Sequence, residues 1–182
     1  GISFTETALQ NNKSIIVIDS DVISSSKVAA GLYNPVILKR FTSVWNAKQQ
    51  LDVLDLFYNK IEKKLNCKFN FEVPILRKFF SVEEQNNWFV ASDKEELNPF
   101  LSTNLISTKY SGIESPFDYG KVNRTGYVDV AFLIKKYQEY LFLNKMFLKD
   151  SFDYSLLLIN NGIQYKDIQA KHIIFAEGFG MH

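Results

Sequence analysis

The spacing of hydrophobic positions changes several times along the chain, and each spacing predicts an element. From Ala47 to Leu65, apolar residues recur every three or four positions, which is typical of an amphipathic helix. The same spacing predicts a helix from Val130 to Asn144, with Asp129 placed to cap it. Ile2 to Asn12 and Ser81 to Phe89 read as shorter helices, the second opening with a capping-box pattern.

Short runs rich in β-branched and aromatic residues predict strands between these helices. Phe69 to Phe80 is one such run, and Pro74 breaks it or places it at a sheet edge because proline has no backbone N–H. Asn160-Asn161-Gly162 is a strong hairpin signal, since these residues tolerate positive φ. The other predicted strands are 15–18, 105–110, 117–122, 124–128, 152–158, 162–165 and 172–175.

Composition narrows the class of protein. At 182 residues, with 46% hydrophobic and 15% aromatic residues, the chain can bury a sizeable core in one or two domains. No apolar run approaches the roughly 20 residues that span a bilayer. The net charge of +1 gives no attraction toward nucleic acid or an anionic membrane. We therefore expect neither as a partner.

Cysteine and histidine are scarce. Cys67 is the single cysteine, so an intrachain disulfide is excluded and a cytoplasmic location is compatible. In its apolar context it is typical of a small core residue. The two histidines, His172 and His182, leave too few ligands for a zinc site, and we expect His172 to be structural.

The strongest chemical signal lies between Ile15 and Val36. Its apolar run ends at Asp19, as in a buried parallel strand whose terminal carboxylate binds the ribose of a dinucleotide. A serine cluster follows, and then small residues that let backbone approach a flat ring closely. These residues are Ser24, Ser25, Ser26, Ala29, Ala30 and Gly31. The alternative is an ordinary strand followed by a plain loop.

This stretch resembles the second strand and following loop of the D-amino-acid-oxidase-like (DAO) family of FAD-dependent oxidoreductases. Two further stretches are similar to the same family: residues 126–134, like its glycine-valine-acid turn into a helix, and residues 168–180, like its late strand beside the flavin. In the family, a strand and a G-x-G-x-x-G turn precede the first stretch, and more sequence follows the last. The resemblance therefore implies an internal fragment of a flavoenzyme.

The resemblance also implies a fold and its domains. It implies an α+β fold in which a mixed or antiparallel sheet carries helices on one face, with α/β remnants at both ends. Residues 1–40 would be a partial Rossmann-like FAD-binding segment, 41–150 the substrate-binding domain, and 151–182 the return to the FAD domain. The strands at 15–18 and 173–175 would then have unpaired edges, which favour a homodimer through these strands.

FAD is the cofactor that the resemblance implies, with an amine or amino acid as the substrate. Asp19 would bind the ribose, Ser24, Ser25 and Ser26 the pyrophosphate or ribityl chain, and Ala29, Ala30 and Gly31 would lie against the isoalloxazine ring. Gly178 and Gly180 would pass near the ribityl chain. No catalytic residue is identified, because the flavin itself accepts the electrons.

Four side chains on predicted strands could bind a substrate carboxylate or close over a planar ring, namely Arg124, Tyr127, Tyr110 and Arg77. Their alternative is an ordinary solvent-facing surface. For the whole chain, the alternative to an oxidoreductase is a non-enzymatic ligand- or protein-binding module without a cofactor, using a sheet rich in Phe and Tyr. A G-x-G-x-x-G directly upstream of Gly1 in the reading frame would favour the enzyme.

Overall fold

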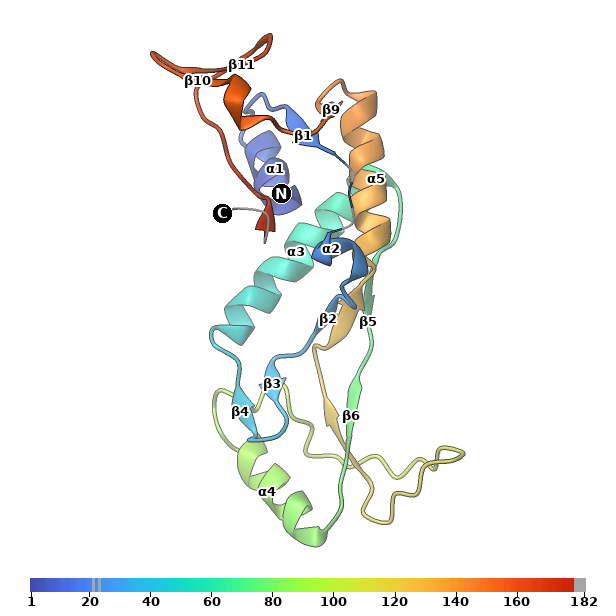
Figure 1. Ribbon diagram of the computed structural model, residues 1–182. Coiled ribbons are helices and arrows are strands. Elements are labelled where there is room, and N and C mark those ends of the chain that lie inside the picture. Colours follow the sequence, from blue (N-terminus) through green and yellow to red (C-terminus); the bar gives the residue numbers. More distant parts are fainter. Residues whose placement is uncertain (21, 23, 179–182) are drawn as a thin grey trace. The chain divides into compact units, whose positions relative to one another are not determined.

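The computed structural model describes residues 1–20, 22 and 24–178. Within this part the chain forms five α-helices and one 3-10 helix (Figure 1). They are α1 (Ile2–Gln10), α2 (Ser25–Val28), α3 (Ala47–Leu65), α4 (Val82–Ser92), α5 (Val130–Leu143) and η1 (Tyr154–Leu156). The four helices predicted from the sequence are confirmed, and Ser81 caps α4 by accepting a hydrogen bond from the backbone N–H of Glu84.

The described strands pair in small, mostly antiparallel sheets, so the protein is a mixed α+β protein. One pair is parallel, β1 (Val17–Asp19) with β9 (Phe147–Lys149). The antiparallel sets are β2 (Leu32–Tyr33), β8 (Gly126–Val128) and β5 (Asn70–Glu72); β3 (Val36–Ile37) and β4 (Thr42–Ser43); β6 (Ile75–Lys78) and β7 (Tyr119–Val122); and β10 (Leu157–Ile159), β11 (Ile163–Tyr165) and β12 (Ile168–Ala170).

The chain divides into two compact units. The central unit comprises residues 25–133, and the terminal unit comprises residues 1–24 and 134–182. The domain boundaries implied by the family, after residues 40 and 150, stay a prediction.

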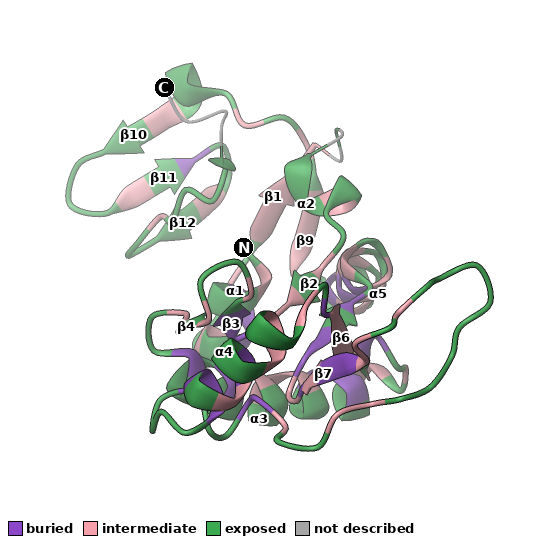
Figure 2. Cartoon of the chain, turned by 90° about the horizontal axis from the view of Figure 1, so that it is seen from below, coloured by how far each residue is buried: buried purple, intermediate pink, exposed green. Residues whose placement is uncertain are grey.

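A hydrophobic core holds the central unit together. Trp88 of α4 is fully buried, meets the rings of Phe41 and Phe79 edge-on at 5.7 and 5.5 Å, and donates its indole N–H to the Ser102 carbonyl at 2.8 Å. β7 contributes a buried face, purple in Figure 2. Other core residues are Val36, Leu51, Ala91, Leu97, Phe100, Leu101 and Val122. Satisfying the indole N–H lets this large ring be buried without an orphaned donor.

β5 and β6 run antiparallel to β8 and β7 as a ribbon that is interrupted by a bulge (Figure 1). Between the two ladders, Val73 and Pro74 face three residues, Asn123, Arg124 and Thr125. Arg124 adopts a left-handed backbone conformation with φ of +55°. Such bulges redirect a side chain away from the regular alternation of a strand. The predicted strand at 124–128 is therefore shorter than expected. Arg124 was expected on a strand, but it lies in the bulge instead.

Thr125 pairs with the backbone groups on either side of Pro74. Its buried hydroxyl donates to the Val73 carbonyl at 2.7 Å and accepts from the Ile75 N–H at 3.0 Å. One side chain thus satisfies a backbone donor and acceptor on the opposite strand.

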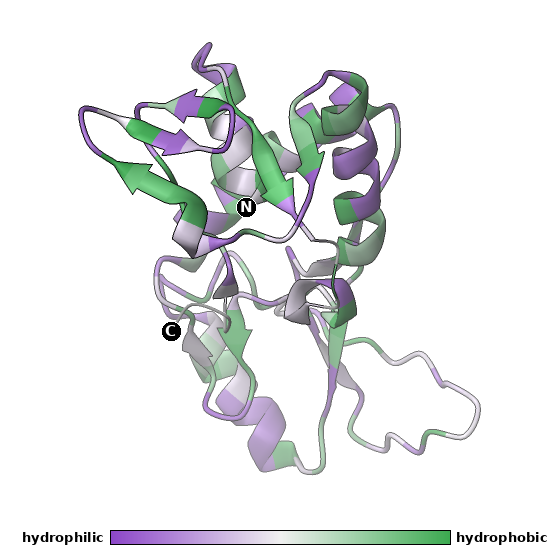
Figure 3. Cartoon of the chain, turned by 45° about the horizontal axis from the view of Figure 1, so that its top comes forward, coloured by the Kyte–Doolittle hydropathy of each residue, from purple (hydrophilic) through white to green (hydrophobic). Residues whose placement is uncertain are grey.

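The terminal unit is held by α1, α5, the β1–β9 pair and the β10–β12 sheet. Bands of hydrophobic and hydrophilic residues alternate along α5 in Figure 3. Tyr137 donates its hydroxyl to the buried Glu6 carboxylate at 2.8 Å, and Gln10 donates to the same carboxylate at 3.0 Å. Burial, with this hydrogen bond and the charge of Glu6, raises the pKa of Tyr137.

Two tight turns make the β10–β12 sheet. Asn160–Gly162 joins β10 to β11, which confirms the predicted hairpin. Lys166, with φ of +52°, and Asp167 join β11 to β12. Phe152 stacks on Tyr165 with ring centroids 4.4 Å apart, so aromatic packing supports the sheet from one side.

Three more of the predicted strands differ from the structure. Residues 105–110 form only isolated pairings, at Ile106 and Tyr110, because the polar residues between them are exposed and bury no apolar face. Residues 172–175 form no strand, since the turn at 166–167 places 168–170 in the ladder instead. In the predicted strand 152–158, residues 154–156 form η1, where the Asp153 carboxylate accepts from the Ser155 N–H, and only 157–159 are extended.

Candidate functional site

Asp19 lies at the carboxyl end of β1, beside its parallel partner β9. It pairs in register with Lys149, and its half-buried carboxylate accepts a hydrogen bond from the Gln138 amide of α5 at 2.9 Å. Ligands of open α/β sheets bind outside the carboxyl ends of parallel strands. Asp19 therefore lies at the carboxyl end of a strand, as its apolar run predicted, and the ribose role stays a prediction.

The serine cluster and the two alanines are exposed. Ser25 and Ser26 begin the short helix α2, Ser24 precedes it, and Ala29 and Ala30 follow it. Within the described part of the chain, no neighbouring residues enclose them as a preformed binding site would.

Gly31 is required by the sheet itself. Its φ is +67°, and a Cβ at this position would overlap the carbonyl oxygen of Val128 in β8. Its own carbonyl accepts from the Val128 N–H at 3.0 Å. The space beside Gly31 on that side is filled by backbone, so this glycine is explained without a flavin ring.

Gly178 has φ of +61° and open space where a Cβ would stand. Gly180 and His182 lie outside the described residues. His172 is exposed and belongs to no strand. Among residues 1–20, 22 and 24–178, no group of three or more His, Cys, Asp or Glu could hold a metal ion.

Arg124 reaches from the bulge to α3. Its two terminal nitrogens lie 2.7 Å from Asp52 Oδ1 and 3.0 Å from Asp55 Oδ2. Burial alone would lower the pKa of Arg124, but the hydrogen bonds to these two aspartates raise it. In the described structure the guanidinium is already bound to two carboxylates, so it is not presented to a substrate carboxylate.

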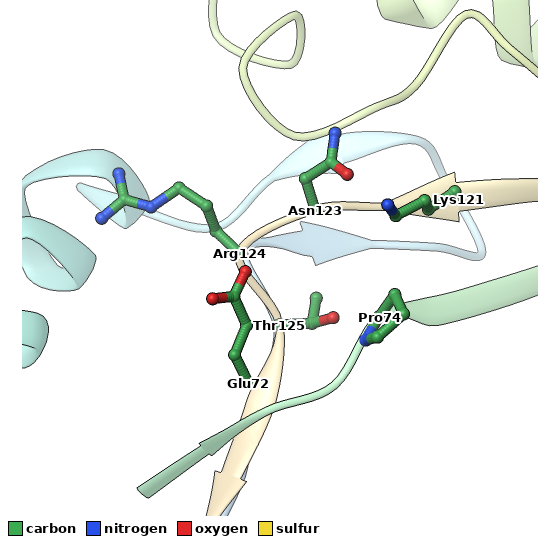
Figure 4. Close-up of a pocket in the computed structure, with 6 residues that line it drawn as sticks. All are labelled: Glu72, Pro74, Lys121, Asn123, Arg124 and Thr125. Atoms are coloured by element: carbon green, nitrogen blue, oxygen red, sulfur yellow. The ribbon is translucent and has the colours of Figure 1, made fainter.

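Two hollows adjoin Arg124. The smaller, of about 190 Å³, lies at the bulge and is lined by Glu72, Pro74, Lys121, Asn123, Arg124 and Thr125. Figure 4 shows the side chain of Arg124 leaving this hollow toward a helix, while Glu72 stays beside the bulge. The larger hollow, of about 350 Å³, shares Glu72 and Arg124 and lies against α3 and β5.

The other predicted substrate residues do not join this group. Tyr127 stacks on Phe71 with centroids 5.1 Å apart. Tyr110 lies in the long loop between α4 and β7 and meets Tyr119 edge-on at 5.6 Å. Arg77 binds Glu84 at 2.7 Å. Each is engaged in local packing or pairing of the central unit.

Sequence reasoning missed Tyr33, Asp55, Asn70 and Glu72, which line the larger hollow. The i, i+3 spacing of Asp52 and Asp55 on the predicted helix was the one available signal, because it places both carboxylates on one side. The predicted flavin residues are divided between the units: Asp19, Ser24 and Gly178 belong to the terminal unit, and Ser25, Ser26, Ala29, Ala30 and Gly31 to the central unit.

No protein-family model matches the chain, and no solved structure matches it. In the part that the structure describes, no helix is both long enough and apolar enough to cross a membrane.

Proposed function

We propose that the chain is part of a cytoplasmic FAD-dependent oxidoreductase that oxidises a C–N bond of an amine or amino acid. The observation that carries the proposal is the carboxylate of Asp19 at the carboxyl end of β1 beside a parallel strand. In this proposal the terminal unit belongs to a Rossmann-like FAD domain, and the antiparallel ribbon of the central unit belongs to the substrate-binding domain.

The carboxylate of Asp19 suits the adenosine end of FAD. A half-buried carboxylate can accept hydrogen bonds from both ribose hydroxyls, and Gln138 orients it by binding Oδ2. When bound, the flavin supplies the electron acceptor, and the chain's own residues hold and orient it. The sequence contains no G-x-G-x-x-G turn, and Ser24, Ser25 and Ser26 are the residues in it proposed for the pyrophosphate or the ribityl chain.

An exchange at Asp19 tests the proposal in the protein made from the complete reading frame. Asp19→Asn removes the charge from the ribose hydrogen bonds, which should weaken FAD binding by about 1.5–3 kcal/mol without unfolding. Asp167→Asn, in the exposed turn after β11, is the matched control and should bind FAD as the parent does. Equal FAD affinity in the Asp19 variant and the parent would refute the ribose role.

The 182-residue chain by itself should be folded but colourless, because its sequence lacks the glycine turn that brings a helix N-terminus up to a pyrophosphate. Purified chain should show no flavin absorbance band and no oxidase activity. A yellow preparation with stoichiometric FAD would contradict this expectation.

A binding module without a cofactor is the second candidate function. The polar hollows beside Arg124 favour it, because they are built entirely within the central unit. A partner-dependent change in hydrogen exchange at residues 105–128, with no response to FAD anywhere, would favour this function over the first.

A further inference from the structure

The larger hollow of the central unit combines one apolar wall with several polar groups. Leu51 of α3 supplies the apolar wall and is 6% exposed. Tyr33 of β2, Asp55 of α3, and Asn70 and Glu72 of β5 supply the polar groups. All these elements belong to residues 25–133, so the hollow lies within one unit.

The basic groups at the hollow are already neutralised. Arg124 binds Asp52 and Asp55, as described above, and Lys68 Nζ lies 2.9 Å from Glu62 Oε2. Lys48 binds Asp52 in turn, at 3.3 Å. Among the residues that line the hollow, two basic side chains, Lys68 and Arg124, thus stand beside two acidic ones, Asp55 and Glu72. The hollow is not built for an anion, because each of its cations already has a carboxylate partner.

Most of the groups left for a ligand can accept a hydrogen bond. Asn70 is 9% exposed, and its Oδ1 has no hydrogen-bond partner in the structure. Within the described part of the chain, the structure records no hydrogen bond for the Glu72 carboxylate or the Tyr33 hydroxyl, and Asp55 uses only Oδ2 toward Arg124. A buried acceptor without a donor is costly, so a donating ligand gains by satisfying it.

The negative charges at the hollow also favour a ligand that donates hydrogen bonds and carries positive charge. Burial raises the pKa of Tyr33, and the negative charges of Asp55 and Glu72 raise it further. These charges would equally stabilise a bound cation. Gly126 leaves room for the Tyr33 ring, because a Cβ there would overlap the Tyr33 hydroxyl.

We propose that this hollow binds an organic ammonium ion, a primary amine with a short apolar chain. Its three N–H donors would meet Glu72, Asp55 and Asn70, and its apolar chain would lie against Leu51. A metal ion is disfavoured, because the described residues contain no cluster of three or more metal-binding side chains. The proposal does not rest on the flavin site, since the hollow shares none of the proposed FAD residues.

The test is a titration of the 182-residue chain with butylammonium chloride, followed by amide NMR. Saturable shifts are expected at the side-chain amides of Asn70 and Asn59 and at the backbone of Glu72. Butanol, which has the same chain without the charge, and sodium acetate serve as control ligands and should give no saturable shift at these groups.

Glu72→Gln removes one charge from an exposed side chain and should weaken butylammonium binding at least about tenfold. Glu83→Gln, on the exposed first turn of α4, is the matched variant and should leave the affinity unchanged. If Glu72→Gln fails to fold, the proposal is judged by whether the shifts in the parent protein lie at Asn70, Asn59 and Glu72. The proposal is overturned by equal shifts with butanol, by shifts elsewhere in the chain, by the absence of saturable shifts, or by unchanged affinity in a folded Glu72→Gln.

Discussion

The two units bury their hydrophobic residues very unequally. Of the eighteen buried hydrophobic residues described, the central unit contains fifteen, and the terminal unit contains three, Tyr137, Leu141 and Tyr165. Both units also expose large apolar residues, such as Leu143 (80%) in the terminal unit and Trp45 (79%) in the central unit. Because burial of apolar surface is the dominant stabilising term, the central unit should carry most of the folding free energy.

The two units can also be compared in how their polar contacts contribute to stability. In the central unit, buried polar groups join one element to another, as Thr125 does across the bulge and Glu62 does between the end of α3 and the nearby start of β5. In the terminal unit, the buried bond of Tyr137 to Glu6 does the same, but several other pairs are exposed, including Lys166 with Asp150 and Tyr154 with Glu177. Exposed pairs contribute little to stability.

The largest expected effect is at Trp88. Trp88→Ala removes a fully buried ring from the core of the central unit and leaves the Ser102 carbonyl without its donor, which should cost about 3–5 kcal/mol. Trp45→Ala is the control, because this tryptophan is 79% exposed and should cost little. Urea unfolding followed by circular dichroism measures both. Similar losses from the two variants would contradict a core centred on Trp88.

Gly31→Ala should cause the second-largest loss of stability. The added Cβ would overlap the Val128 carbonyl oxygen at a positive φ, and clash and strain together should cost about 2–4 kcal/mol. Gly112→Ala is the control, since Gly112 has φ of +78° but open space around it, so that only about 1–2 kcal/mol of strain applies. Equal losses in thermal or urea unfolding would mean that the approach of β8 does not require Gly31.

Glu62→Leu should cost about 2–3 kcal/mol, because it leaves the buried N–H groups of Phe69 and Asn70 without the carboxylate that accepts from them at 2.9 and 2.8 Å. Glu139→Leu, at an exposed pair with Lys136 on α5, is the control and should change unfolding little.

The pH dependence sharpens this prediction. Burial alone would raise the pKa of Glu62, but the hydrogen bonds from Asn70, Phe69 and Lys68 lower it below its usual 4.5. A depressed pKa gives stability that is present above pH 4.5 and is lost as the pH falls through the folded-state value. The stability difference between parent and Glu62→Leu should therefore narrow in acid. A difference independent of pH would contradict the ionised carboxylate.

The smallest expected effect is at the bulge. Thr125→Val keeps the shape of the side chain but leaves the Ile75 N–H and the Val73 carbonyl unpaired, at about 1–3 kcal/mol. Thr42→Val, at an exposed position of β4, should be close to neutral. Loss of amide protection at Ile75 in Thr125→Val, but not in Thr42→Val, is the expected signature, and unchanged protection would contradict the role of the hydroxyl.

The sequence predicted those elements whose signal is local. The apolar stripe of α3 gave its bounds, Ser81 and Glu84 located the start of α4, and Pro74 located the break between β5 and β6. β9 was missed, because its three residues directly after the Lys145 turn carry too short a pattern to separate from the end of α5. The strand expected at 172–175 failed because pairing depends on partners that local pattern cannot show.

The candidate sites follow the same rule. Asp19 could be placed at a strand end from its apolar run alone. The hollow beside Arg124 could not, because it depends on one extra residue opposite Val73 and Pro74 that turns the arginine toward α3. Gly31 was interpreted as a flavin contact, whereas the close approach of Val128 explains it without a ligand.

Hydrogen exchange of the protein made from the complete reading frame, with and without FAD, tests the central proposal most directly. If Asp19 binds the ribose, FAD should slow exchange at the carboxyl end of β1 and in β9, and Asp19→Asn should reduce that protection at a fixed FAD concentration. The ribbon of β5–β8 should already be protected without FAD, because its core lies within the central unit. Unchanged exchange at residues 17–19 and 147–149 in the presence of saturating FAD would contradict the proposed function.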